Sequence, residues 1–150
     1  MNIKELANYL LSKNSMTNKK LQKMIYYITG WHVALLDKDL IPHDNFEAWV
    51  HGPVCPDLYH KYKNYGWKDI PKIFDYSCTE ISVDSKELID EVIERYGDYS
   101  GDDLEALSHQ EQPWLEAREG LEEWHPSTKI ISKEVMRKYF LKLYEEAQYD

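Results

Sequence analysis

Apolar residues recur at helical spacing through most of the chain. Near the N-terminus they follow i, i+3, i+4, i+7 and i+8, which places one apolar stripe on a helix over residues 3–11. The same period runs from 21 to 35 after Thr17, a good N-cap residue, and this is the clearest helix in the sequence. Gly30 inside that helix costs about 1 kcal/mol relative to alanine, so we expect a neighbouring element to pack closely against it.

Start and stop signals predict further helices downstream. In the last of them Val135, Tyr139 and Leu143 form the apolar stripe, with Met136 and Phe140 beside it. The expected helices are one from Pro56 that Gly66 stops, one with a capping box of Asp84 and Glu87 that runs to Tyr96, one capped by Ser100 with Asp103, a short one from Pro113 to Arg118, and a last one capped by Ser132.

Strand signals are few. The segment FEAWVH, residues 46–51, is short, rich in aromatic and β-branched residues and bounded by turn formers, so it predicts a strand. His51, Gly52 and Pro53 are expected to turn the chain towards the helix at Pro56. CTEISV, residues 78–83, is an open alternative for a second strand. The sequence therefore predicts a mainly α, compact helical domain over residues 1–150, with a small strand element near 46–51 and an optional one at 78–83.

Composition adds limits on partners. The chain has 150 residues, 18 Lys and Arg against 27 Asp and Glu, and a formal net charge of -9. A negative charge of this size disfavours nucleic acid and anionic membranes and favours a cationic partner. The N-terminal segment lacks the continuous apolar run of a signal peptide, and the most apolar stretch, 24–36, is too short to span a bilayer. We expect a cytoplasmic protein without a membrane partner.

The segment FEAWVHGPVCPDLYH, residues 46–60, concentrates reactive side chains. His51, Cys55 and His60 are metal-ligand types, and Cys78 could be a fourth, but their spacing matches no paired zinc signature. Cys55 with a histidine could also be a nucleophile and its base, although nothing nearby supplies an oxyanion hole. We expect a buried Cys55, histidines in polar roles, and neither a metal nor a cofactor.

Two other polar clusters receive structural interpretations. In SHQEQPW, residues 108–114, His109 and Glu111 are acid and base types, but residues two apart on a helix point to different sides. We therefore expect a helix end followed by a proline-started helix. The basic run of Asn18, Lys19, Lys20 and Lys23 is expected to be a solvated helix face.

Aromatic content is the strongest compositional hint of function. The chain has 5 Trp, 12 Tyr and 3 Phe. Many of these rings must lie in the core, but we expect several to be partly exposed. Tryptophan and tyrosine are the side chains that most often anchor protein interfaces. The chemistry therefore favours binding over catalysis.

Three blocks follow one another over about residues 20–120, and they read LQKMIYYITGWHVAL, FEAWVHGPVCPDLYHKYKNYG and LIDEVIERYGDYSGDDLEALSHQEQPWLEAR. Together they resemble the Panacea domain family, which includes SocA-like and GepA-like, phage-associated antitoxins. The candidate partner-binding or fold-determining residues are Trp31, His32, Trp49, His51, Gly52, Pro53, Tyr59, His109, Glu111, Pro113 and Trp114. The resemblance gives no catalytic residues.

The resemblance implies an antitoxin that neutralises a protein toxin encoded by an adjacent gene, by direct contact. Some SocA-like members deliver their toxin to a ClpXP-type protease, so a proteolytic adaptor is an open alternative. A small metal- or cysteine-dependent hydrolase using His51, Cys55 and His60 is the alternative of another class.

Overall fold

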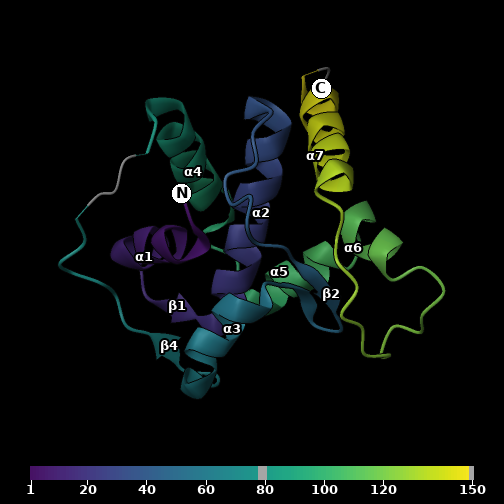
Figure 1. The fold of residues 1–150 in the computed structure, drawn as a ribbon, viewed down its shortest axis with the longest axis horizontal. Helices are drawn as coiled ribbons and strands as arrows, with labels where there is room; N and C mark the ends of the chain where they lie inside the picture. Colours follow the sequence, from purple (N-terminus) through teal and green to yellow (C-terminus); the bar gives the residue numbers. More distant parts are fainter. Residues whose placement is uncertain (78–80, 149–150) are drawn as a thin grey trace.

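The computed structural model describes residues 1–77 and 81–148, and it confirms the mainly α fold (Figure 1). Most of the described chain is helical, and the strands are short. The helices are α1 Ile3–Lys13, α2 Asn18–Leu36, α3 Pro56–Tyr62, α4 Val83–Tyr96, α5 Gly101–Ser108, α6 Gln112–Ala117 and α7 Lys133–Ala147, with a 3-10 turn η1 Lys63–Tyr65.

Helix α2 is the centre of the fold. It packs against α7, α4, α5, α1 and α3, so nearly every face of it is covered (Figure 1). The close approach expected at Gly30 is confirmed, because a Cβ there would lie 2.3 Å from Cε2 of Phe140 on α7. Phe140 and Met136 are the fully buried residues of α7, whereas Tyr139 and Leu143 lie at the edge of its buried face.

Most predicted helix caps are confirmed. Thr17 accepts a hydrogen bond from the Lys20 N–H, and Ser100 forms a capping box with Asp103. The capping box predicted at Asp84 and Glu87 is wrong. Ser82 caps α4 instead, by accepting a hydrogen bond from the Ser85 N–H. Asp84 lies in the first turn of α4, where its negative charge interacts favourably with the positive end of the helix dipole and stabilises the helix. Ser132 caps α7 as expected.

The strand predicted at 46–51 is confirmed in a shorter form, as one arm of a hairpin. Strand β2, Glu47–Trp49, pairs antiparallel with β3, Gly52–Val54. The predicted turn at Gly52 and Pro53 is therefore wrong, since Val50 and His51 form the turn and Pro53 lies opposite Ala48 in the ladder. Gly52 has φ +104°, a conformation that side-chain-bearing residues rarely adopt.

A second antiparallel pair, β1 Met16–Thr17 with β4 Asp69–Ile70, was not predicted. Of the optional strand at 78–83, residues 78–80 lie outside the described residues and Val83 is the first residue of α4. No described helix has the length and apolar character needed to cross a membrane.

Candidate functional site

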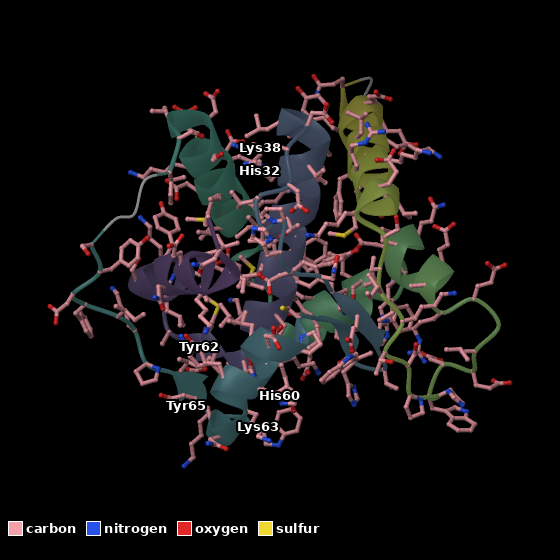
Figure 2. All side chains as sticks on the ribbon, viewed as in Figure 1. His32, Lys38, His60, Tyr62, Lys63 and Tyr65 are labelled. Atoms are coloured by element: carbon pink, nitrogen blue, oxygen red, sulfur yellow. The ribbon has the colours of Figure 1, made fainter. Side chains whose placement is uncertain are left out.

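A groove of about 310 Å³ opens between the N-terminal half of α2, the β2–β3 hairpin and the α3–η1 segment. We call it the aromatic groove, and Figure 2 places the α3–η1 wall at one edge of the molecule, where Tyr62, Lys63 and Tyr65 gather. Trp67 at its rim is 86% exposed. The residues that shape it are Lys19 and Lys23 from α2, Trp49 and His51 from the hairpin, Tyr59 from α3, and Trp67.

Buried amides tie the walls of the aromatic groove together. The Asn18 side chain donates to the backbone oxygen of Tyr59 at 3.1 Å and accepts from the Gln22 amide at 3.0 Å. The Gln22 oxygen in turn accepts the Cys55 N–H at 3.0 Å, at the start of α3. This chain of hydrogen bonds fixes α3 against α2.

Lys23 lies between α2 and the hairpin. The residue is only 1% exposed, and its amine makes no hydrogen bond or ion pair within residues 1–77 and 81–148. Desolvation, with the nearby charge of Lys19, lowers the pKa of Lys23 to about 7, although Glu105 opposes the shift. Gly52 permits this packing, since a Cβ there would lie 2.7 Å from Cε of Lys23. The expected solvated face at 18–23 is therefore wrong for Asn18 and Lys23, which are both buried.

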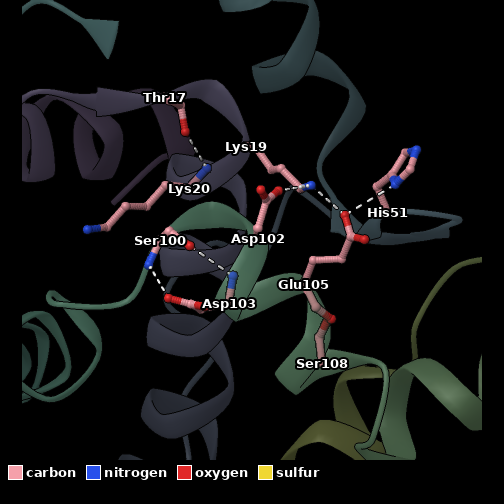
Figure 3. A network of polar contacts seen from close by, with 9 residues as sticks. All are labelled: Thr17, Lys19, Lys20, His51, Ser100, Asp102, Asp103, Glu105 and Ser108. Atoms are coloured by element: carbon pink, nitrogen blue, oxygen red, sulfur yellow. Dashed lines mark hydrogen bonds and ion pairs between the residues drawn. The ribbon is translucent and has the colours of Figure 1, made fainter. Parts of the chain in front are cut away.

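A charged network borders the aromatic groove (Figure 3). Lys19 Nζ lies 2.6 Å from Asp102 Oδ1 and 2.6 Å from Glu105 Oε1, and His51 Nδ1 lies 3.2 Å from the same Glu105 oxygen. Burial alone would raise the pKa of Glu105, but its contacts with Lys19 and His51 hold it below its usual value. Lys19 also keeps its charge, since hydrogen bonds to Asp102 and Glu105 outweigh desolvation and raise its pKa.

Side chains from α6 and its C-cap residue Arg118 donate hydrogen bonds to the backbone of strand β2 and fix the hairpin. The Trp114 indole donates to the backbone oxygen of Trp49 at 2.9 Å, and the buried Arg118 guanidinium donates to that of Ala48 at 2.7 Å. His109 stacks on Trp114 with ring centroids 4.1 Å apart. Trp49 itself is half-buried, its indole donating to Glu47 at 2.8 Å and its ring packing against Tyr59 at 5.0 Å. Its ring is thus presented to the groove rather than to the core.

Glu111 is buried at the start of α6, next to Pro113. It accepts a hydrogen bond from the Tyr27 hydroxyl at 2.7 Å. Burial raises the pKa of Glu111 to about 7, although hydrogen bonds from Tyr27 and Tyr139 oppose the shift. As predicted for SHQEQPW, His109 ends α5 and Glu111 precedes α6, so the two residues are not an acid–base pair on one helix face.

Trp31 and His32 lie in the C-terminal half of α2, away from the end that lines the aromatic groove. Figure 2 shows His32 at the opposite side of the molecule from Tyr62, Lys63 and Tyr65. His32 Nδ1 donates to the Lys38 backbone oxygen at 2.6 Å, and Nε2 lies 2.8 Å from the Ser85 hydroxyl. The Trp31 indole donates to the Tyr96 hydroxyl at 2.9 Å. Both side chains therefore hold α4 and the segment after α2 in place.

The reactive residues of FEAWVHGPVCPDLYH point to different surroundings. Cys55 is buried, and desolvation raises the pKa of its thiol, which is the opposite of an activated nucleophile. His51 at the hairpin turn and His60 on α3 are both exposed, and Cys78 lies outside the described residues. Within the described part of the chain, no cluster of three or more His, Cys, Asp or Glu residues has metal-binding geometry.

Sequence reasoning missed Lys23, Gln22 and Arg118, which are polar residues on or beside apolar helices. The period of α2 assigned polar positions to solvent. The available signal was the density of large apolar residues on every side of α2, such as the adjacent Tyr26 and Tyr27, which indicates a helix covered all round.

Comparison with known proteins identifies the family. Residues 21–115, more than half of the chain, match the family described as antitoxin SocA-like, Panacea domain. All eleven candidate residues named from the sequence, and also Lys23, lie inside the matched range. Searches of curated proteins and of solved structures found no match. The chain therefore belongs to the antitoxin SocA-like, Panacea domain family.

Proposed function

We propose that this protein is a non-enzymatic, cytoplasmic antitoxin that binds a cognate protein toxin and thereby neutralises it. Membership of the SocA-like, Panacea domain family is the observation that carries the proposal. The toxin is proposed to be the product of an adjacent gene, as the family resemblance implies.

The aromatic groove is our candidate for part of the toxin-binding surface. Trp67 is 86% exposed at its rim, and the rings of Trp49 and Tyr59 lie half-buried in its walls. Exposed aromatic rings beside a concave surface are typical anchors of protein interfaces. The hairpin and α3 fix the rings of Trp49 and Tyr59, which pack against each other, so these two rings would need little ordering on binding.

A growth assay tests the proposal. Expression of the adjacent gene alone is expected to arrest growth, co-expression with this protein is expected to restore it, and the two proteins are expected to copurify. A Cys55→Ala variant should restore growth equally well, since neutralisation by binding does not need a thiol. A harmless neighbouring gene product, or rescue that disappears with Cys55→Ala in a folded protein, would contradict the proposal.

The same cells separate blocking from delivery to a protease. If this protein only blocks the toxin, toxin half-life should be equal in cells with and without a ClpXP-type protease. A half-life that shortens only when both this protein and the protease are present would show a proteolytic adaptor instead.

A further inference from the structure

The Lys23 side chain is buried, and among the described residues its amine has no hydrogen-bond or ion-pair partner. It is 1% exposed, and in residues 1–77 and 81–148 nothing accepts a hydrogen bond from it. A buried ammonium without a counter-ion is unfavourable by several kcal/mol in general. Lys23 is also one of the residues that line the aromatic groove, so the groove is the route by which an anion could approach it from solvent.

Among the residues that the structure describes, the surroundings of Lys23 offer no free carboxylate. Glu105 of α5 is the charged neighbour of opposite sign, and it is already bound by Lys19 and His51. Lys19 is the neighbour of like sign, and its charge lowers the pKa of Lys23. His109, at the end of α5, is a further titratable neighbour, and desolvation, with the charge of Lys23, lowers the pKa of its imidazole. Lys19 and Glu105 have opposite effects on the pKa of Lys23, and Glu105 is engaged by Lys19 and His51, so the amine has no counter-ion of its own among the described residues.

We propose that Lys23 and the rings of the aromatic groove hold a carboxylate side chain of an acidic segment of the protein partner. The inference rests on the proposed function, because it takes the toxin as that partner. Trp49, Tyr59 and Trp67 supply apolar contact for the residues that flank the carboxylate, and Lys23 supplies the charge. The side chains that line the groove would also suit a phosphate group. The net charge of -9, however, repels a polyanion such as nucleic acid. A single carboxylate on a partner that is basic overall is compatible with this net charge.

Such a site makes binding depend on pH. Desolvation holds the pKa of free Lys23 near 7, and a bound carboxylate would raise it, so binding takes up a proton above pH 7. Affinity should then fall as pH rises from 7 to 9, by up to about 10-fold per unit, since the protonated fraction falls by that factor.

Binding of the purified product of the adjacent gene tests the proposal directly. At pH 7, Lys23→Met should weaken binding roughly 10-fold or more, because one partner of a buried charge pair is lost. Trp67→Ala, which changes an exposed side chain and so leaves the fold intact, should weaken it as well. Lys61→Met is the matched control, since Lys61 is an exposed lysine on α3 outside the aromatic groove, and it should stay within about 3-fold of the unmodified protein.

The pH series completes this measurement. The fall in affinity between pH 7 and 9 should vanish in Lys23→Met and persist in Lys61→Met. Equal affinity of Lys23→Met and the unmodified protein for the toxin would overturn the proposal.

A measurement without the toxin separates this inference from the proposed function. The pKa of Lys23, followed by NMR of its side chain, should rise on addition of a capped glutamate peptide and stay unchanged with the capped glutamine analogue. If the toxin does not bind but the glutamate peptide raises the pKa, the carboxylate site stands and the proposed function fails. If the toxin binds Lys23→Met normally and the peptide has no effect, the antitoxin stands and the carboxylate site fails. A rise with inorganic phosphate or a short oligonucleotide, but not with the glutamate peptide, would overturn the proposal in favour of a phosphate ligand.

Discussion

Tyr26 and Tyr27 are adjacent in α2 and both fully buried, yet their hydroxyls have opposite surroundings. Tyr27 donates to Glu111, whereas the Tyr26 hydroxyl is without a partner among the described residues. A buried hydroxyl without a partner costs free energy, and a bonded one stabilises. We expect Tyr26→Phe to raise the free energy of unfolding by about 1 kcal/mol and Tyr27→Phe to lower it by about 1 to 3 kcal/mol. Urea denaturation at pH 7 measures both, and equal effects of the two changes would contradict the assignment.

Glu111 should make stability depend on pH. Burial raises its pKa to about 7 in the folded chain, whereas the unfolded chain ionises near the ordinary value of 4.5. Between these two values the folded state holds a proton that the unfolded state releases, so this group lowers stability as pH rises from 4.5 to 7. Glu111→Gln keeps an acceptor for Tyr27 but cannot ionise.

Glu111→Gln should therefore stabilise the protein at pH 8 by on the order of 2 to 3 kcal/mol and have little effect at pH 4.5. Urea unfolding across this range measures the difference. The same substitution at exposed Glu116 is the control and should be nearly neutral throughout. A gain for Glu111→Gln that does not change with pH would contradict the raised pKa.

At the scale of single residues, the sequence indicated burial better than it indicated partners. Periodicity placed Ile25 and Ile28 in the core, and both are fully buried. It could not show that Lys23 and Arg118 are buried too, because their surroundings come from segments far away in the chain. Arg118, for example, binds the backbone of Ala48 across 70 positions.

At the scale of elements, local signals predicted the helices well and the strand pairs poorly. Helix caps such as Thr17 and Ser132 act within three residues, so the sequence displays them directly. Strand pairing is not local, and the pair of β1 with β4 joins residues more than fifty positions apart. Gly52 and Pro53 are strong turn formers, but here Gly52 provides the positive φ beside the turn and leaves room for Lys23.

The crossing of α2 and α7 depends on Gly30. Alanine is favoured over glycine in a helix by about 1 kcal/mol, but the new Cβ would lie 2.3 Å from the Phe140 ring. That ring is confined by Tyr26, Tyr27 and Trp31, so it cannot move away easily. We expect overpacking to dominate and Gly30→Ala to destabilise the protein by about 1 to 3 kcal/mol.

A double-mutant cycle checks the cause of that loss. In a Phe140→Ala background the clash is absent, so Gly30→Ala should become neutral or stabilising by up to about 1 kcal/mol. Equal losses in the two backgrounds would show that the cost of Gly30→Ala does not come from the ring.

At the scale of the whole molecule, charge acts at two ranges. The net charge of -9 favours a partner that is basic overall and guides it from a distance. The aromatic groove acts only at short range, where Lys23 and the rings of Trp49, Tyr59 and Trp67 would bind one carboxylate of the partner. Raising the salt concentration should therefore slow association, while Lys23→Met should mainly speed dissociation.

The core of the molecule extends beyond the family match at 21–115. Leu6 and Leu10 of α1 and Phe140 of α7 are almost completely buried, and α1 and α7 both cover α2. We propose that residues 1–150 fold as one unit, so a fragment spanning 14–118, which lacks both helices, should show no cooperative thermal transition and should bind a hydrophobic dye. In the full chain, Phe140→Ala should cost about 3 to 5 kcal/mol. Exposed Tyr144 on the same helix is the control, and Tyr144→Ala should cost about 0.5 kcal/mol or less. A cooperative transition in the 14–118 fragment would instead make α1 and α7 additions to a smaller domain that folds by itself.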